Sequence, residues 1–221
     1  MISCRILFDA RGLTVPPNVI SNKISEFGES YTDATRDIIQ GSRVLDKDGE
    51  VFIKCASRIL SNFKMTRRGI FHDNLEDTLY ECWSLIGTNL VELNTSIRRS
   101  GFSRDRYLLE LSDTKREEII SEIWLMTKAL LPLTMTKLSY GLVGASKILF
   151  SVLPEIVLPT DNTQWKQLFK TVDLGDVLRF MVFDIQQWER ITGSKLNDLD
   201  LSRRLTTLPS VYNVMAMAAR P

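Results

Sequence analysis

The sequence has very little histidine and cysteine, and this scarcity removes several kinds of catalytic and metal site. Of its 221 residues, one is histidine and three are cysteine. A zinc site with several histidines, an HExxH motif or a relay of several histidines is therefore excluded. The cysteines, Cys4, Cys55 and Cys82, are odd in number and widely spaced, so they form neither a disulfide framework nor a metal knuckle. They favour a reducing compartment, and we expect a cytoplasmic protein.

The chain also lacks an excess of charge and a long apolar run. It has 28 basic and 27 acidic residues, a formal net charge of +1, so it does not attract nucleic acid or anionic membranes broadly. No apolar stretch reaches the roughly 18 to 20 residues that span a bilayer, and we expect neither a membrane segment nor a secretory signal. Any nucleic-acid surface must be local. The candidate basic clusters are Arg67 with Arg68, Arg98 and Arg99 with Arg104 and Arg106, and Arg203 with Arg204.

Motifs for nucleotides and metals are missing as well. There is no GxxxxGK[ST] phosphate loop and no GxGxxG after a strand, so we expect no cofactor. His72 remains available as a base for a serine or cysteine nucleophile, although no spacing pairs it with one. Asp48, Glu50 and Lys54 are close in sequence, but their order does not match the usual metal-dependent nucleases. We therefore expect no bound metal.

The apolar pattern predicts an all-α, compact multi-helix fold. Hydrophobic residues make up 44% of the chain and charged residues 25%, as in ordinary globular proteins. Apolar positions recur every three or four residues, and strand-like alternation is confined to residues 4–8 and 51–54. We expect a single domain over residues 1–221, with a lobe boundary near 100–113 as the alternative. The predicted helices are 18–27, 32–40, 50–64, 74–98, 113–132, 145–153, 162–169, 173–192 and one that begins at Pro209.

The segment 140–169, YGLVGASKILFSVLPEIVLPTDNTQWKQLF, holds the most chemically suggestive residues. Lys147 follows a turn of small residues, and Asp161 follows an apolar run with prolines and begins a helix. A lysine buried among apolar neighbours is a better nucleophile, because burial disfavours its charged form. An aspartate at a helix N-terminus stays ionised. Such a pair suits chemistry that passes through a sugar cation.

A simpler interpretation of the same residues needs no chemistry. Asp161 would be an N-cap after Pro159, and Lys147 would be a surface residue on an amphipathic helix. The two interpretations differ in where the side chains lie. A catalytic pair would line one cleft, whereas the simpler interpretation places Lys147 in bulk water.

Residues 141–147, GLVGASK, and 158–161, LPTD, resemble the core of the helix-hairpin-helix DNA glycosylases. In that family a glycine-rich hairpin precedes a helix that bears a lysine, and an aspartate follows an apolar loop and heads the next helix. The likeness covers about thirty residues. Ser139 and Tyr140 stand where the family has Leu-Pro, and the four cysteines of an iron–sulfur cluster, present in some members, are absent.

The resemblance implies removal of a base flipped out of DNA, with Asp161 as catalytic carboxylate and Lys147 as nucleophile. Backbone N–H groups of the hairpin would hold a phosphate, and aromatic side chains would flank the base. The alternative is a non-catalytic helical protein–protein interaction module whose apolar terminal helix, residues 211–219, docks on a partner or self-associates. The implied DNA-binding residues are Gly141, Gly144, Ala145, Ser146, Tyr140 and Trp165.

Overall fold

The computed structural model describes residues 6–26, 45–67, 69–135, 140–201, 205 and 207–219. Within these ranges the regular structure is helical, which confirms the predicted all-α fold. The one pairing of extended backbone in the same ranges is an isolated bridge between Phe8 and Thr14. The predicted helix at 32–40, Cys4, Arg68, Arg203 and Arg204 lie outside the described residues.

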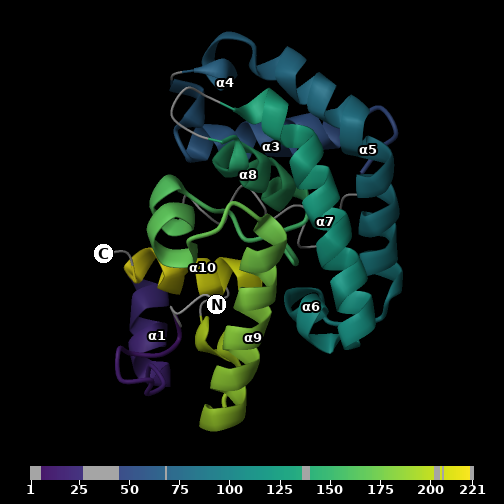
Figure 1. Ribbon diagram of the computed structural model, residues 1–221. Helices are drawn as coiled ribbons and strands as arrows, with labels where there is room; N and C mark the ends of the chain where they lie inside the picture. Colours follow the sequence, from purple (N-terminus) through teal and green to yellow (C-terminus); the bar gives the residue numbers. More distant parts are fainter. Residues whose placement is uncertain are drawn as a thin grey trace.

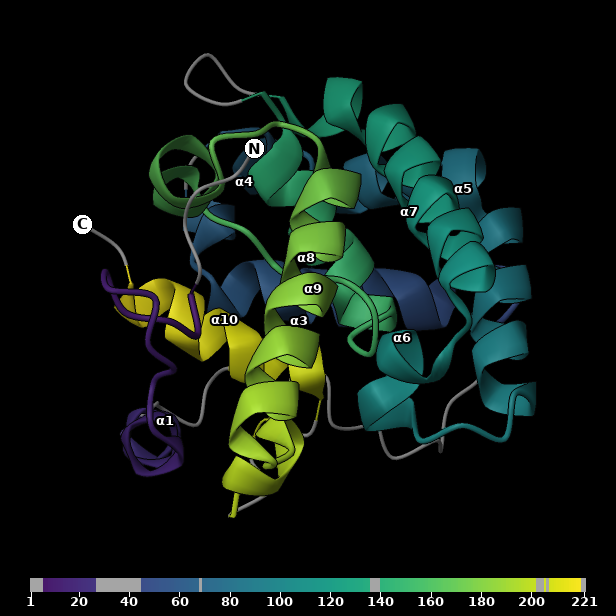
Figure 2. The same ribbon diagram turned by 60° about the horizontal axis from the view of Figure 1, so that its bottom comes forward.

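The helices pack around one connected apolar core, to which residues on both sides of 100–113 contribute. Figure 1 shows α5 and α7 side by side and antiparallel on one flank, with α9, α10 and α1 on the other and α8 between them. Figure 2 shows α9 lying across the front of the molecule, with α10 behind it. The elements are α1 (Pro17–Ser25), α3 (Glu50–Asn62), η2 (Met65–Arg67), α4 (Ile70–Asp73), α5 (Leu75–Arg99), η3 (Arg104–Arg106), α6 (Tyr107–Glu110), α7 (Asp113–Thr134), α8 (Leu142–Val152), η4 (Gln164–Phe169), α9 (Leu174–Thr192), η5 (Leu196–Leu199) and α10 (Leu208–Ala218).

Residues 51–54, a candidate strand, are helical and belong to α3. Apolar residues on this helix recur at helical spacing, so Phe52, Cys55 and Ile59 lie on one buried face. The carboxylate of Asp46 accepts hydrogen bonds from the first backbone N–H groups of the helix. The local acceptor and the helical apolar period together outweigh the short run of strand-forming residues.

Residues 211–219 do not form the exposed apolar helix expected of a docking module. They lie largely in α10, where Val211, Tyr212 and Met215 are buried. The helix is apolar on most of its circumference, and a helix of this kind packs inside a protein instead of on its surface. None of the helices in the described part of the chain is both long and apolar enough to cross a membrane.

A buried carboxylate on α9 ties the two ends of the described chain together. The Oδ2 atom of Asp184 accepts hydrogen bonds from the backbone N–H groups of Ile6 and Leu7 and from the Tyr212 hydroxyl, each at 3.0 Å. A charge withdrawn from water is stable only when such donors surround it. Asp184 therefore fixes the N-terminal segment and α10 against α9.

Replacement of Asp184 by alanine is expected to lower the free energy of unfolding by about 3 kcal/mol or more, because several buried donors lose their acceptor. The control is Tyr212→Phe, which removes one of these donors and is expected to cost about 1 kcal/mol. Urea denaturation of both variants measures the difference. An alanine variant no less stable than the phenylalanine variant would contradict this role of Asp184.

Candidate functional site

The two segments that carry the candidate amine and carboxylate are hydrogen-bonded to each other. The Thr160 backbone N–H donates to Ser146 Oγ at 3.1 Å, and the two hydroxyl oxygens lie 3.0 Å apart. Lys147 follows Ser146 in α8, and Asp161 follows Thr160 in the returning segment. Lys147 and Asp161 therefore each follow one member of a hydrogen-bonded pair of residues, although a helix and a loop separate them in the sequence.

Lys147 is buried, with 7% of its surface exposed. Its Nζ atom lies 4.3 Å from the centroid of the Phe63 ring, at the end of α3, which is a cation–π distance. Every residue of α8 is buried, so this helix offers no face to bulk water. The part of the simpler interpretation that places Lys147 on the surface is therefore wrong.

Asp161 caps the helix that follows it, as the sequence predicts. Its Oδ1 atom accepts the backbone N–H of Gln164 at 2.8 Å, and its own N–H donates to Gln164 Oε1 at 2.9 Å. This reciprocal pair is a capping box. The Gln164 side chain also donates to Asn213 Oδ1 at 2.8 Å, so the cap is connected to α10. The half-buried carboxylate of Asp161 is thus held in a defined place at the start of η4.

Gly141 and Gly144 allow α8 to approach the end of α7 closely. Gly141 has φ +85°, and a Cβ there would lie 2.5 Å from the Leu131 carbonyl oxygen. A Cβ on Gly144 would lie 2.8 Å from the Cβ of Thr134, whose hydroxyl donates to the Gly141 carbonyl. These contacts favour a packing role for Gly141 and Gly144. Phosphate binding by the backbone N–H groups of residues 141–145 stays a prediction. The buried small residues are Gly141, Gly144, Ala145 and Ser146.

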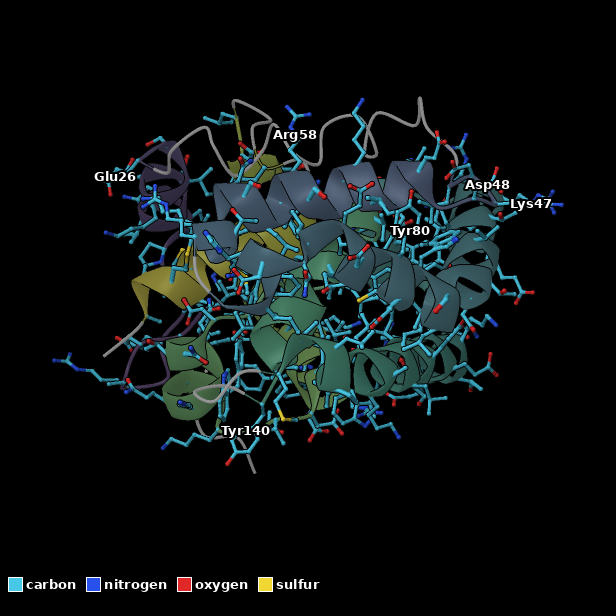
Figure 3. The ribbon with its side chains drawn as sticks, turned by 90° about the horizontal axis from the view of Figure 1, so that it is seen from above. Glu26, Lys47, Asp48, Arg58, Tyr80 and Tyr140 are labelled. Carbon is cyan, nitrogen blue, oxygen red and sulfur yellow. The ribbon has the colours of Figure 1, made fainter. Side chains whose placement is uncertain are left out.

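Tyr140 and Trp165 are brought together, with Tyr140 on the outside. Tyr140 is 63% exposed, and its ring packs edge-on against Trp165 with centroids 5.7 Å apart. Figure 3 shows Tyr140 at one edge of the molecule, on the side opposite Arg58 of α3. The exposed Lys166 places its Nζ 5.0 Å from the Trp165 ring. Sequence reasoning did not single out Lys166, which its contact with Trp165 places at this aromatic pair.

Two members of the predicted arginine cluster form internal ion pairs. Arg106 donates to both carboxylate oxygens of Glu189 on α9, at 2.8 and 2.7 Å. Arg104 is ion-paired with Glu155, in the segment between α8 and Asp161. Arg98 and Arg99 are exposed at the end of α5. The pairing of Arg104 and Arg106 with distant carboxylates gives them a structural role that the sequence did not reveal.

The described residues give no support to the other chemistries considered from the sequence, namely a nucleophile activated by His72 and a metal site. His72 is exposed, and its Nδ1 lies 2.6 Å from Asp73 Oδ1. Burial, with a smaller effect of Glu81, raises the pKa of the Cys82 thiol to about 12, so this thiol is protonated and a poor nucleophile. In the described ranges no group of three or more His, Cys, Asp or Glu residues is placed to hold a metal. Asp48, from the nuclease hypothesis, lies beside Lys47 near one end of α3 (Figure 3).

A surface groove of about 710 Å³ runs between the second half of α5 and the start of α7. Neither Lys147 nor Asp161 lines it. Its lining mixes apolar, aromatic and basic side chains, among them Val91, Arg99, Phe102, Tyr107 and Lys115. The groove is thus separate from the residues that the sequence singled out.

The carboxyl group of Glu155 is fully buried in the segment that leads to Asp161. Burial raises its pKa above the ordinary value of 4.5, and the nearby Arg104 opposes this effect only in part. Between the ordinary and the raised pKa, the folded state therefore binds a proton that the unfolded state has released. Stability contributed at this position is consequently lost as the pH rises through that window.

We expect the free energy of unfolding of the wild type, relative to Glu155→Gln, to fall as the pH rises from the ordinary pKa of a glutamate, 4.5, through the raised pKa of Glu155, because the glutamine has no proton to lose. Urea denaturation at a series of pH values measures this difference. When Arg104 is also replaced by glutamine, the same difference in free energy of unfolding should go on falling to higher pH, because the positive charge that holds down the pKa of Glu155 is gone. A difference that is flat or rises with pH would show that Glu155 does not have a raised pKa.

Comparison with known protein families, with curated proteins and with solved structures gives no match for this chain. A functional proposal therefore rests on the residues of the chain and on their contacts. The contacts that bear on it are those of Lys147, Asp161 and the aromatic pair Tyr140 and Trp165.

Proposed function

We propose that the chain binds DNA and removes a base from it, through a site like that of the helix-hairpin-helix glycosylases. In this proposal Asp161 is the catalytic carboxylate and Lys147 is the amine. The protein would work in the cytoplasm without a bound cofactor, because three widely spaced cysteines favour a reducing compartment.

The observation that carries the proposal is the hydrogen bonding between Ser146 and Thr160. It joins the helix of the amine to the loop of the carboxylate directly next to both candidate residues. A lysine without a functional or structural demand is normally exposed, because its charge is costly to bury. Lys147 is instead held inside the protein against Phe63.

The chemistry proposed for these groups is cleavage of the bond between the sugar C1′ and the base nitrogen. The leaving base takes the bonding electron pair and gains a proton, while positive charge develops on the sugar. The Asp161 carboxylate stabilises that charge across a short distance. A new bond to C1′ is then formed by water or by Lys147, whose side chain first moves away from Phe63 and gives up its ammonium proton. In either case the attacking group loses one proton, which balances the proton gained by the base.

A substrate surface is proposed beside Asp161. The exposed ring of Tyr140 would stack on a base that has left the duplex, and Lys166 would contact a neighbouring phosphate. The edge-on contact with the Trp165 ring would hold the Tyr140 ring in place. The alternative function is a non-catalytic protein-interaction module, and the helix at 211–219 that was considered as its docking surface is mostly buried. We therefore favour the DNA-processing proposal.

The Asp161→Asn variant is expected to lose base release by about 100-fold or more, because the uncharged amide does not stabilise a sugar cation. The assay is base release from duplexes that each carry one mismatched, deaminated, alkylated or oxidised base. The matched control is Asp173→Asn, since Asp173 also caps a helix through its side chain, accepting the N–H of Asp176. Equal losses in the two variants, or no release by the wild type from any duplex, would refute the proposed reaction.

The Lys166→Gln variant is expected to weaken binding to a duplex with a mismatch and to reduce the slope of log affinity against log salt by about 0.9, the value for one phosphate contact. Fluorescence anisotropy at a series of salt concentrations measures this slope. Lys128→Gln is the control, because Lys128 lies 5.8 Å from the ring of Trp124 in a similar pair on α7. An unchanged slope in Lys166→Gln, or the same change in both variants, would exclude the proposed phosphate contact.

A further inference from the structure

The segment that joins α8 to Asp161 is buried throughout residues 153–160, and yet it contains a carboxylate. The Glu155 side chain has no solvent exposure, and its ion-pair partner is Arg104, from the turn η3 between α5 and α6. A buried carboxylate is stable only when a positive charge or hydrogen-bond donors stay beside it. The position of the segment is therefore coupled to the position of Arg104.

The turn η3 is itself held in place by its other arginine. Arg106 forms the paired hydrogen bonds to Glu189 on α9 and also donates to Asn197 Oδ1 at 2.6 Å. Two arginines on a single turn thus reach in different directions, Arg106 to α9 and η5, and Arg104 to the segment before Asp161. The contacts of Arg106 therefore hold in place the turn that also carries Arg104, the partner of Glu155.

The Arg104–Glu155 pair anchors one part of this segment, and the hydrogen bonds between Thr160 and Ser146 anchor its end. A small cavity of about 10 Å³ lies at Glu155, and Arg106 also lines it. Arg104, which is ion-paired with Glu155, and Arg106, which lines the same cavity, are two charged groups near Glu155. The other lining residues are apolar and come from α6, α9 and α10: Leu108, Leu109, Met181, Val182, Ile185, Leu208 and Pro209.

We propose that Arg104 and Glu155 are positioning residues for Asp161. Their ion pair holds residues 153–160 in place, and so fixes the capping box in which Asp161 and Gln164 bond each other. Arg104 and Glu155 do not touch substrate in this scheme. Their role in catalysis rests on the proposed function, whereas their effect on the place of Asp161 does not.

Backbone hydrogen exchange of the free protein tests this directly, because the Gln164 N–H is bonded to the carboxylate of Asp161. At a pH at which Glu155 is ionised, the exchange of Gln164 in Glu155→Gln is expected to rise at least about tenfold, while the amides in the middle of α5 and α7 stay protected. Arg104→Gln should give the same local pattern, and the double variant should add little to either change. Arg104→Lys keeps the charge and should restore part of the protection.

Asp200→Asn is the matched control, since Asp200 is another buried carboxylate and accepts the Leu205 N–H at 2.7 Å. This variant should raise exchange at Leu205 and leave Gln164 unchanged. Unchanged exchange at Gln164 in Glu155→Gln, or an equal rise across α5 and α7, would overturn the positioning role. If DNA processing fails but the local exchange pattern is found, only the proposed function is lost. If both hold, base release in Glu155→Gln should slow with little change in DNA affinity.

Discussion

The burial of α8 on every side is the constraint on which the rest of the candidate site depends. A helix with no solvent face must satisfy each of its polar groups inside the protein. Ser151 does so within the helix, through the Ile148 carbonyl, whereas Ser146 bonds across to Thr160. Lys147 lies over the ring of Phe63. The same constraint thus fixes the returning segment against the helix and keeps an amine in a place where water has little access.

Buried carboxyl groups connect parts of the chain that are far apart in sequence. Asp184 holds the N-terminal segment and α10, and Glu155 holds the segment before Asp161. Each carboxyl group contacts residues that are far away in sequence, so the segments that carry them cannot shift independently without breaking a buried polar contact. The place of Asp161 is therefore set from two sides, by its bond to Gln164 and by the Arg104–Glu155 pair behind it.

The helices were predictable because periodicity and capping are local properties. The predicted helices 74–98 and 173–192 correspond to α5 and α9 within a residue or so, and Asp161 caps its helix as its place after Pro159 indicated. The contacts that shape the site were not predictable, because they depend on tertiary packing. Neither the burial of Lys147 nor the pairing of Arg104 with Glu155 follows from any spacing in the sequence. Gly141 and Gly144 show the same limit. Close packing against α7 and phosphate binding both require small residues, so the sequence does not distinguish these two roles.

The most direct test of the proposed site is a crystal structure of the protein with a duplex that contains an abasic-site analogue. The proposal predicts that the analogue leaves the duplex and lies within hydrogen-bonding distance of the Asp161 carboxylate. Tyr140 would then lie against DNA, and the Lys147 amine would have turned from Phe63 toward the sugar. A duplex bound elsewhere on the surface, with Asp161 engaged only in its capping box and Lys147 still over Phe63, would contradict the proposal, as would the failure of a complex to form.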